Sequence, residues 1–260
     1  MTTPLRVLPS PEAIGEDIAR HLLERIEEAR RADAPFLLGC PTGRTPRPLY
    51  GAMARRLAKK PQDLSHLVLV MMDEYLEPIA GGFVHAASTN AWSCHHFVRV
   101  EIVDKWNTSL PPELRLREES IWFPDPRNPT SYDSRVAGAG GIDFFILASG
   151  ASDGHVAFNP PGSDRTSRTR VIALSEDTRR DNLQTFPEFG TLTSVPTHGV
   201  SVGIDTIASA KAGVMVVWGA GKRLTLQRIL GAEHYEMEWP ATVIHELAGR
   251  EILSDTAAMA

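Results

Sequence analysis

The chain has 260 residues, of which 42% are hydrophobic and 23% are charged, and its formal net charge at pH 7 is −5. This length allows one large domain or two small ones with a substantial core, and the composition is ordinary for a globular protein. The acidic balance and the lack of Lys- or Arg-rich blocks argue against a nucleic-acid partner, and no apolar run approaches the roughly 18 residues that a membrane span needs.

The cysteines and the N-terminus indicate the compartment. Cys40 and Cys94 are too few for a disulfide framework, so we expect reduced thiols. We see no apolar segment of the kind found in secretory signals. We therefore expect a cytoplasmic protein without a membrane partner.

Predicted helices and strands alternate along the chain. Residues 11–32 carry an apolar side chain every four positions between charged ones, which is the pattern of an amphipathic helix. The apolar run 34–40 predicts a buried strand, and Pro46 suits the start of the next helix. The further elements expected, in chain order, are a helix over 47–60, a strand over 66–75, a helix near 88–105, a strand over 120–124, a small helix inside the loop 124–141, strands over 141–150 and 170–175, a turn and short helix over 199–210, a strand over 213–220 and a helix over 222–231.

These elements indicate the fold class. Strands that are apolar throughout are buried on both faces, and strands that alternate with helices are joined by crossovers into a mainly parallel sheet. No repeat or convincing linker interrupts the chain. We predict a single α/β domain over residues 1–260 with a doubly wound, mainly parallel sheet of the Rossmann-like kind.

Polar residues follow several of the predicted strands, where ligands of open parallel sheets bind. The turn PTGRTP offers backbone N–H groups, the Thr42 and Thr45 hydroxyls and the Arg44 guanidinium, all suited to a phosphate. An ordinary turn in which Gly43 supplies a special backbone angle is an equal alternative. Lys222 follows the strand predicted at 213–220.

Three acid–base residues also follow apolar strands. Asp73 is placed to move a proton to and from carbon, although a carboxylate there also serves to cap a turn. Asp153 and His155 are two residues apart in a turn, so both can face one pocket. No set of ligands at metal-binding spacing occurs in the sequence, and we expect no metal.

The chain resembles the glucosamine-6-phosphate deaminase and 6-phosphogluconolactonase superfamily. The resemblance is collinear over nearly the whole chain, through LGCPTGRTP, MMDEYLEP, GIDFFILASGASDGHVAFN, SRTRVIALSEDTRRDN, VPTHGVSVGIDTI, GAGKRLTLQ and PATVIHEL. The motifs DEY and DGHVAFN are similar to the deaminase branch, whereas the lactonases typically have DER and DGHTAS. The resemblance implies the deaminase/lactonase type of α/β fold.

The resemblance also implies roles for individual residues. Asp73 corresponds to the carboxylate that moves a proton between C2 and C1 of the open-chain sugar. Asp153 and His155 correspond to the pair that promotes ring opening. Gly43, Thr45 and Lys222 correspond to the phosphate ligands, and the family needs neither a metal nor an organic cofactor.

Three positions depart from the deaminase pattern. Pro160 stands where the family has a Glu that partners the ring-opening His, so that Asp153 or the nearby Asp164 must hold the imidazole, unless the substrate needs no opening. Arg44 replaces a glycine beside the expected phosphate, and Gln184 stands where deaminases carry a phosphate-binding Arg. The ending Pro-Pro-Gly-Ser is similar to that of the lactonases.

The function predicted on these grounds is aldose–ketose isomerisation of an amino-sugar phosphate with loss of ammonia. The alternatives are hydrolysis of a sugar lactone phosphate, in which His155 activates a water, and a non-catalytic regulator that binds a sugar phosphate. The retention of Asp73, Asp153 and His155 argues against the regulator. The expected partner is a small sugar phosphate, and the sequence leaves open whether the chain forms a homo-oligomer.

Overall fold

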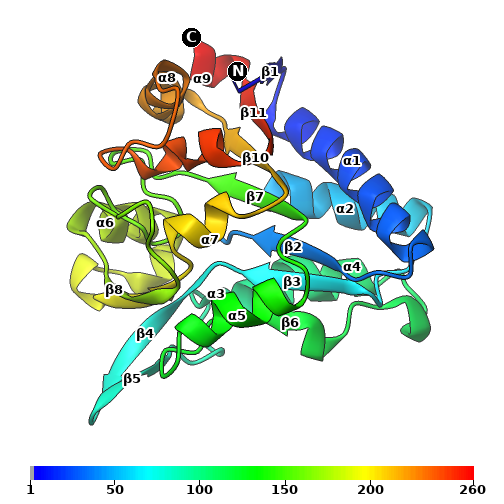
Figure 1. Cartoon of the computed structure of the whole chain (residues 1–260), viewed down its shortest axis with the longest axis horizontal. Coiled ribbons are helices and arrows are strands. Elements are labelled where there is room, and N and C mark those ends of the chain that lie inside the picture. Colours follow the sequence, from blue (N-terminus) through cyan, green and yellow to red (C-terminus); the bar gives the residue numbers. More distant parts are fainter. Residues whose placement is uncertain (1–2) are drawn as a thin grey trace.

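A seven-stranded sheet, in which every neighbouring pair of strands is parallel, runs through the centre of the computed structural model, which describes residues 3–260 (Figure 1). In spatial order its strands are β1 (Leu5–Leu8), β11 (Gly249–Asp255), β10 (Ala212–Val217), β7 (Phe144–Ala148), β2 (Phe36–Cys40), β3 (Leu67–Met71) and β6 (Ile121–Trp122). The prediction of a mainly parallel sheet is confirmed.

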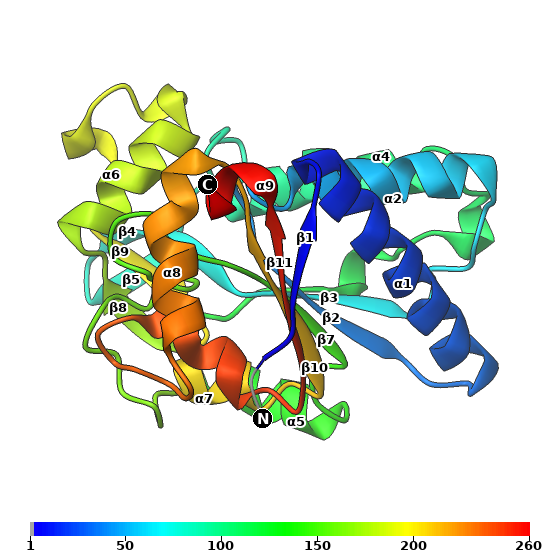
Figure 2. The same ribbon diagram turned by 90° about the horizontal axis from the view of Figure 1, so that it is seen from above.

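Helices cover both faces of this sheet, as a doubly wound fold requires. The side chains of β2 show why: Phe36 and Leu38 join the core under α1 and α2, while Leu37 between them joins the core on the opposite face. Figure 2 shows α1, α2 and α4 on one side of the sheet and α7 and α8 on the other. The helices are α1 (Pro11–Arg31), α2 (Arg47–Lys59), α3 (Cys94–Phe97), α4 (Asp104–Asn107), α5 (Thr130–Gly138), α6 (Glu176–Thr185), α7 (Ile204–Ala208), α8 (Arg223–Gly231) and α9 (Thr256–Met259).

The first helix follows the pattern read from the sequence. Ser10 caps α1 by accepting a hydrogen bond from the backbone N–H of Ala13 at 3.2 Å, and Pro11 occupies the first position of the helix. The buried face of α1 includes the four-residue repeat of Ile14, Ile18, Leu22 and Ile26, which packs into the core beneath the sheet. The predicted helix near 88–105 is also present, as α3 and α4 joined by a π-helical stretch, Val98–Val103.

A second, antiparallel sheet corrects two predictions. The single strand predicted over 66–75 is two strands: β3 ends at Met71, and β4 (Asp73–Ile79) leaves in the other sheet. The predicted turn and short helix over 199–210 begins with a strand, β9 (His198–Ser201), and then continues as α7. The order of this sheet is β5 (Gly82–His85), β4, β9 and β8 (Arg170–Ala173). The chain changes sheets at Met72, which places Asp73 at the junction of the two.

Two strands at the edge of the main sheet were not predicted. β1 has only four residues, and β11 begins with the polar segment Gly249–Glu251, so neither has the continuous apolar run of the central strands. Their parallel pairing, which brings Leu5 opposite Ile252, joins the two ends of the chain. Within residues 3–260, no helix combines the length and the apolar character that crossing a membrane requires.

Candidate active site

A pocket that is open to solvent, with a cavity volume of about 150 Å³, lies beyond the carboxyl ends of β2, β3, β7 and β10, with α6 on one side. This is the edge at which open parallel sheets bind ligands. Of the residues predicted from the sequence, those that line the pocket are Thr42, Gly43, Arg44, Thr45, Asp73, His155 and Lys222. Asp153 lies behind His155.

The turn after β2 forms one wall of the pocket. Gly43 has a φ of +91°, in the left-handed region that glycine adopts without strain, and this fixes the path of the chain toward α2. Thr42 and Thr45 lie half-buried in this wall, and Arg44 is exposed. Gly43 has the special backbone angle, and the turn also lines the pocket. The interpretation as an ordinary turn and the interpretation as a phosphate-binding turn are therefore compatible.

Lys222 enters the pocket from a single 3-10 turn, Ala220–Lys222, between β10 and α8. Its ammonium group donates a hydrogen bond to the backbone carbonyl oxygen of Ser149. Burial lowers the pKa of Lys222 to about 8; the nearby charge of Asp181 opposes that shift and the charge of Arg44 adds to it. Lys222 and Arg44 therefore supply two basic groups to one end of the pocket.

His155 is held by Asp153. The Nδ1 atom of His155 lies 2.7 Å from Oδ1 of Asp153. Burial disfavours the charged form of Asp153, but its hydrogen bonds with His155 outweigh burial and lower the pKa of this carboxyl. An ionised carboxylate only accepts hydrogen bonds, so Nδ1 carries the proton and donates it, which leaves Nε2 free to exchange a proton with a ligand.

The backbone between these two residues needs glycine. Gly154 has a φ of +67°, and a Cβ atom at this position would come within 2.3 Å of the ring of Trp239. Three residues later, Ala157 also has a positive φ, of 50°, although it is not a glycine. Strained backbone of this kind is found where the surrounding structure imposes a geometry on a site.

Asp73 lies buried at the junction of the two sheets and faces the pocket. Burial raises the pKa of Asp73 to about 7, while the thiol of Cys94 and the charge of His155 oppose that rise. A carboxyl group with a pKa near neutrality is able both to accept and to release a proton under ordinary conditions.

Cys94 connects Asp73 to the turn after β2. Its Sγ atom lies 3.5 Å from Oδ1 of Asp73 and 3.5 Å from Oγ1 of Thr42. Burial raises the pKa of Cys94 well above its ordinary value, so the group is a neutral thiol that donates to the carboxylate. From its sequence, Cys94 was expected only to be a reduced thiol, since nothing in the local sequence places it against Asp73.

Glu74 holds Cys94 beside Asp73 through hydrogen bonds to the backbone. Its buried carboxylate accepts hydrogen bonds from the backbone N–H groups of Tyr75 at 2.7 Å, Cys94 at 3.0 Å and His95 at 2.8 Å. The carboxylate therefore holds the start of α3 against β4. Burial raises the pKa of Glu74 to about 8, and the three backbone donors oppose that rise.

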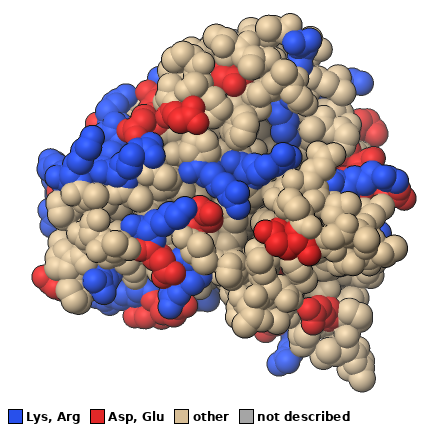
Figure 3. All heavy atoms as spheres, turned by 180° about the vertical axis from the view of Figure 1, so that it is seen from behind, with Lys and Arg blue, Asp and Glu red and all other residues tan. Residues whose placement is uncertain are grey.

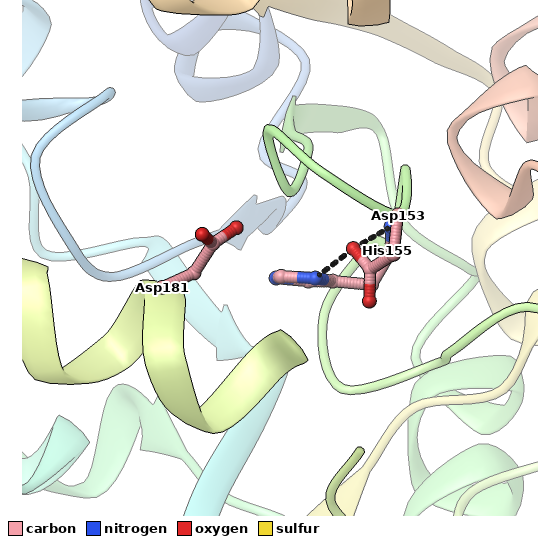
Figure 4. Close-up of side chains that lie close together, drawn as sticks. All are labelled: Asp153, His155 and Asp181. Carbon is pink, nitrogen blue, oxygen red and sulfur yellow. Dashed lines mark hydrogen bonds and ion pairs between the residues drawn. The ribbon is translucent and has the colours of Figure 1, made fainter. Parts of the chain in front are cut away.

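Asp181 is a site residue that the sequence analysis missed. It projects from α6 toward the ring of His155, on the opposite side from Asp153 (Figure 4). Ligand atoms of Asp153, His155 and Asp181 lie within 4.8 Å of one another. Such a set can hold a metal ion, but here Nδ1 of His155 is already engaged by Asp153, and the ammonium of Lys222 shares the pocket.

The structure also shows what holds the imidazole in the absence of a Glu at position 160. Asp153 does so directly, whereas Asp164 is exposed and accepts hydrogen bonds from the N–H and the hydroxyl of Thr166. The carbonyl oxygen of Pro160 accepts hydrogen bonds from Ser163 and closes a turn.

Charges of both signs meet on the molecular surface as well as in the pocket. On the face shown in Figure 3, basic side chains run in a band across the middle and acidic side chains lie beside them. Within the pocket, the basic pair Arg44 and Lys222 shares one space with Asp73, His155 and Asp181. The fold and this set of residues define an α/β protein with a polar pocket in which basic groups, carboxyl groups and an imidazole lie together.

Comparison with known proteins identifies the family within that class. The chain belongs to the family described as "Glucosamine-6-phosphate isomerases/6-phosphogluconolactonase", whose pattern matches residues 9–253. It is 28% identical to a glucosamine-6-phosphate deaminase of Shouchella clausii, over 95% of this chain and 92% of that protein. It is 32% identical to one from Cronobacter sakazakii, over 86% and 80% of the two chains.

A solved structure confirms the fold. A protein described as a monomeric glucosamine-6-phosphate deaminase superimposes with a TM-score of 0.81 at 24% sequence identity, over 98% of both chains. The family match over residues 9–253 confirms the resemblance inferred from the motifs at the level of the superfamily.

Proposed function

We propose that the protein converts a 2-amino-sugar phosphate of the glucosamine-6-phosphate type into a ketose phosphate and ammonia. The observation that carries this proposal is the position of Asp73, a buried carboxyl with a pKa raised to about 7, in the same pocket as His155 and the basic pair Arg44 and Lys222. The deaminase names of the relatives support the same reaction.

The first step in this proposal is ring opening. His155, oriented by its hydrogen bond to Asp153, presents Nε2 to the pocket. There it exchanges a proton between the ring oxygen and the hydroxyl on C1, which breaks the C1–O5 bond and leaves an open-chain aldehyde. The phosphate is held at the other end by Lys222, Arg44 and the turn after β2.

The next steps move a proton between carbons. Asp73 removes the proton from C2; the electron pair of that C–H bond forms the C1–C2 double bond, and the carbonyl oxygen on C1 takes up a proton from solvent, which gives an enolamine. The same carboxyl returns its proton to C1, which leaves an iminium at C2 that releases a proton to solvent when water adds. Addition of water to C2 and loss of ammonia complete the ketose, so the reaction consumes one water and needs neither an oxidant nor a reductant.

The test is an ammonia-release assay across 2-amino-sugar phosphates, run in parallel with hydrolysis of a sugar lactone phosphate. We expect ammonia and ketose phosphate in equal amounts from an amino-sugar phosphate, and loss of both products in Asp73→Asn. Lactone hydrolysis that depends on His155, without any release of ammonia, would replace this proposal with a lactonase activity.

A further inference from the structure

Asp181 is a pocket carboxylate for which the proposed reaction has no use. It lies on the face of α6 that looks into the pocket, one helical turn before Thr185. Thr185 in turn lies beside the turn after β2: its Cγ2 atom is 3.6 Å from the position of a Cβ on Gly43. Asp181 is therefore next to the space in which Arg44 and Lys222 would hold an anion.

The carboxylate of Asp181 is fixed in place and only partly satisfied. Its Oδ2 atom accepts a hydrogen bond from the backbone N–H of Ala151 at 3.0 Å. Among the described residues 3–260, no side chain donates to Oδ1, and no ion pair joins Asp181 to Lys222, although their charges interact across the pocket. The Oδ1 atom of Asp181 is therefore available to a ligand in the pocket that the ammonium of Lys222 also lines.

An anion in this position is attracted by two neighbouring groups and repelled by a third. Lys222 and Arg44 attract it, whereas Asp181 repels it, unless the anion itself carries a proton that the carboxylate can accept. Phosphate and singly protonated phosphate monoesters carry such a proton, but sulfate and sulfate esters do not. A carboxylate in a binding site thus selects against anions that have no proton to donate.

We propose that Asp181 accepts a hydrogen bond from the bound anion and makes this site selective for a protonated phosphoryl group over sulfate. The inference deepens the proposed function, on which it rests for the assignment of the anion to the substrate. It assigns to Asp181 a binding role and not a catalytic one, and it predicts that a phosphate monoester binds best in its singly protonated form, which a sulfate ester cannot adopt.

The test is titration calorimetry of the whole protein with inorganic phosphate and with inorganic sulfate, slightly above neutral pH. There both anions carry two negative charges, and only phosphate has a proton to donate. We expect phosphate to bind at least about tenfold more tightly than sulfate. Phosphate gains a hydrogen bond to the charged carboxylate of Asp181, whereas sulfate is still repelled by it. A change in the protonation of the protein's own groups cannot produce this preference, because it would affect both anions equally. The other titratable or charged groups at the site are Asp73, Asp153, His155, Arg44 and Lys222.

The decisive variant is Asp181→Asn, whose amide oxygen can still accept the N–H of Ala151 while its amide nitrogen donates to an anion. Sulfate binding should strengthen by about tenfold and the preference for phosphate should disappear. Asp177→Asn, an exposed position one turn earlier on α6, is the matched control and should keep the preference of the unmodified protein.

The outcomes separate this inference from the proposed function. Equal binding of phosphate and sulfate to the unmodified protein, or an unchanged sulfate affinity in Asp181→Asn, overturns the role of Asp181 alone. If neither anion binds, the anion site of the proposed function is contradicted as well. No turnover is needed for either conclusion.

Discussion

The two ends of the pocket are built in different ways. At the acid–base end, His155 is 2.7 Å from Asp153, and Asp73 lies buried against the thiol of Cys94. At the anion end, Arg44 is exposed, and Asp181, which also faces His155, has one oxygen to which no side chain within residues 3–260 donates. The acid–base end is fixed by contacts between buried or half-buried groups, and the anion end depends on the charges around a solvent-open space.

This difference indicates how each end responds to change. Proton transfer to carbon needs a donor and an acceptor at set distances, so an isosteric substitution at the acid–base end removes the chemistry even when the shape is kept. Anion binding depends on summed charge, which falls gradually as single groups are removed. Substitutions at the two ends should therefore affect kcat and KM separately.

The largest effect is expected for Asp73→Asn. The amide has nearly the same shape but cannot accept the C2 proton, so kcat should fall by about a hundred- to ten-thousandfold with little change in KM. Steady-state kinetics measure this, with the exposed Asp164→Asn as the control for loss of a carboxylate. An equal loss in both variants would show that the effect is not specific to the pocket.

Asp153→Asn should have the next largest effect. The amide no longer fixes the proton on Nδ1 of His155, so ring opening should slow and kcat should fall by about a hundredfold. The rate should recover on an open-chain analogue, which does not need that step. Failure to recover would mean that Asp153 acts on a later step than ring opening.

The pH dependence should reflect both ends. Asp73 acts as a base only when ionised; because its pKa is raised to about 7, kcat should fall about tenfold for each pH unit below that value. Lys222 binds an anion only when protonated; because burial lowers its pKa to about 8, KM should rise above that value. A kcat that stays constant from about pH 5 to pH 9 would contradict the role of Asp73.

The smallest effect is expected for Arg44→Ala. This exposed side chain adds one positive charge to the anion end, so KM for an anionic sugar should rise by about tenfold or less while kcat stays the same. A neutral analogue should lose nothing. Arg47→Ala, three residues along and outside the pocket lining, is the matched control. Equal effects on the anionic and the neutral sugar would remove Arg44 from the anion site.

The acid–base end was also the more predictable part of the sequence. Asp73, Asp153 and His155 each follow an apolar strand, and the ends of parallel strands converge, so their common location follows from the strand pattern. The motifs of the resemblance carry the same three residues. What the pattern could not give is the bend at Met72, because the residues before and after it read as one strand.

The contribution of α6 could not be predicted. This helix is polar on nearly all sides, with Thr178 as its only buried residue, so no periodicity indicates which face meets the pocket. Asp181 and Cys94 reach the site through contacts with segments 30 and 21 residues away, at Ala151 and Asp73. Contacts between residues so far apart in the sequence depend on how the helices and strands pack together. The local sequence pattern does not predict them.

The central claim is that Asp73 moves a proton between two carbon atoms of a sugar phosphate. The most direct measurement is turnover of glucosamine 6-phosphate in heavy water, followed by detection of deuterium in the ketose phosphate and in the remaining substrate. The account predicts deuterium at C1 of the ketose in the unmodified protein and none in Asp73→Asn. Asp73 lines a pocket that is open to solvent, so the proton that it holds exchanges with heavy water between its removal from C2 and its return to C1. Turnover that leaves both molecules free of deuterium, or exchange that persists in Asp73→Asn, would contradict the account.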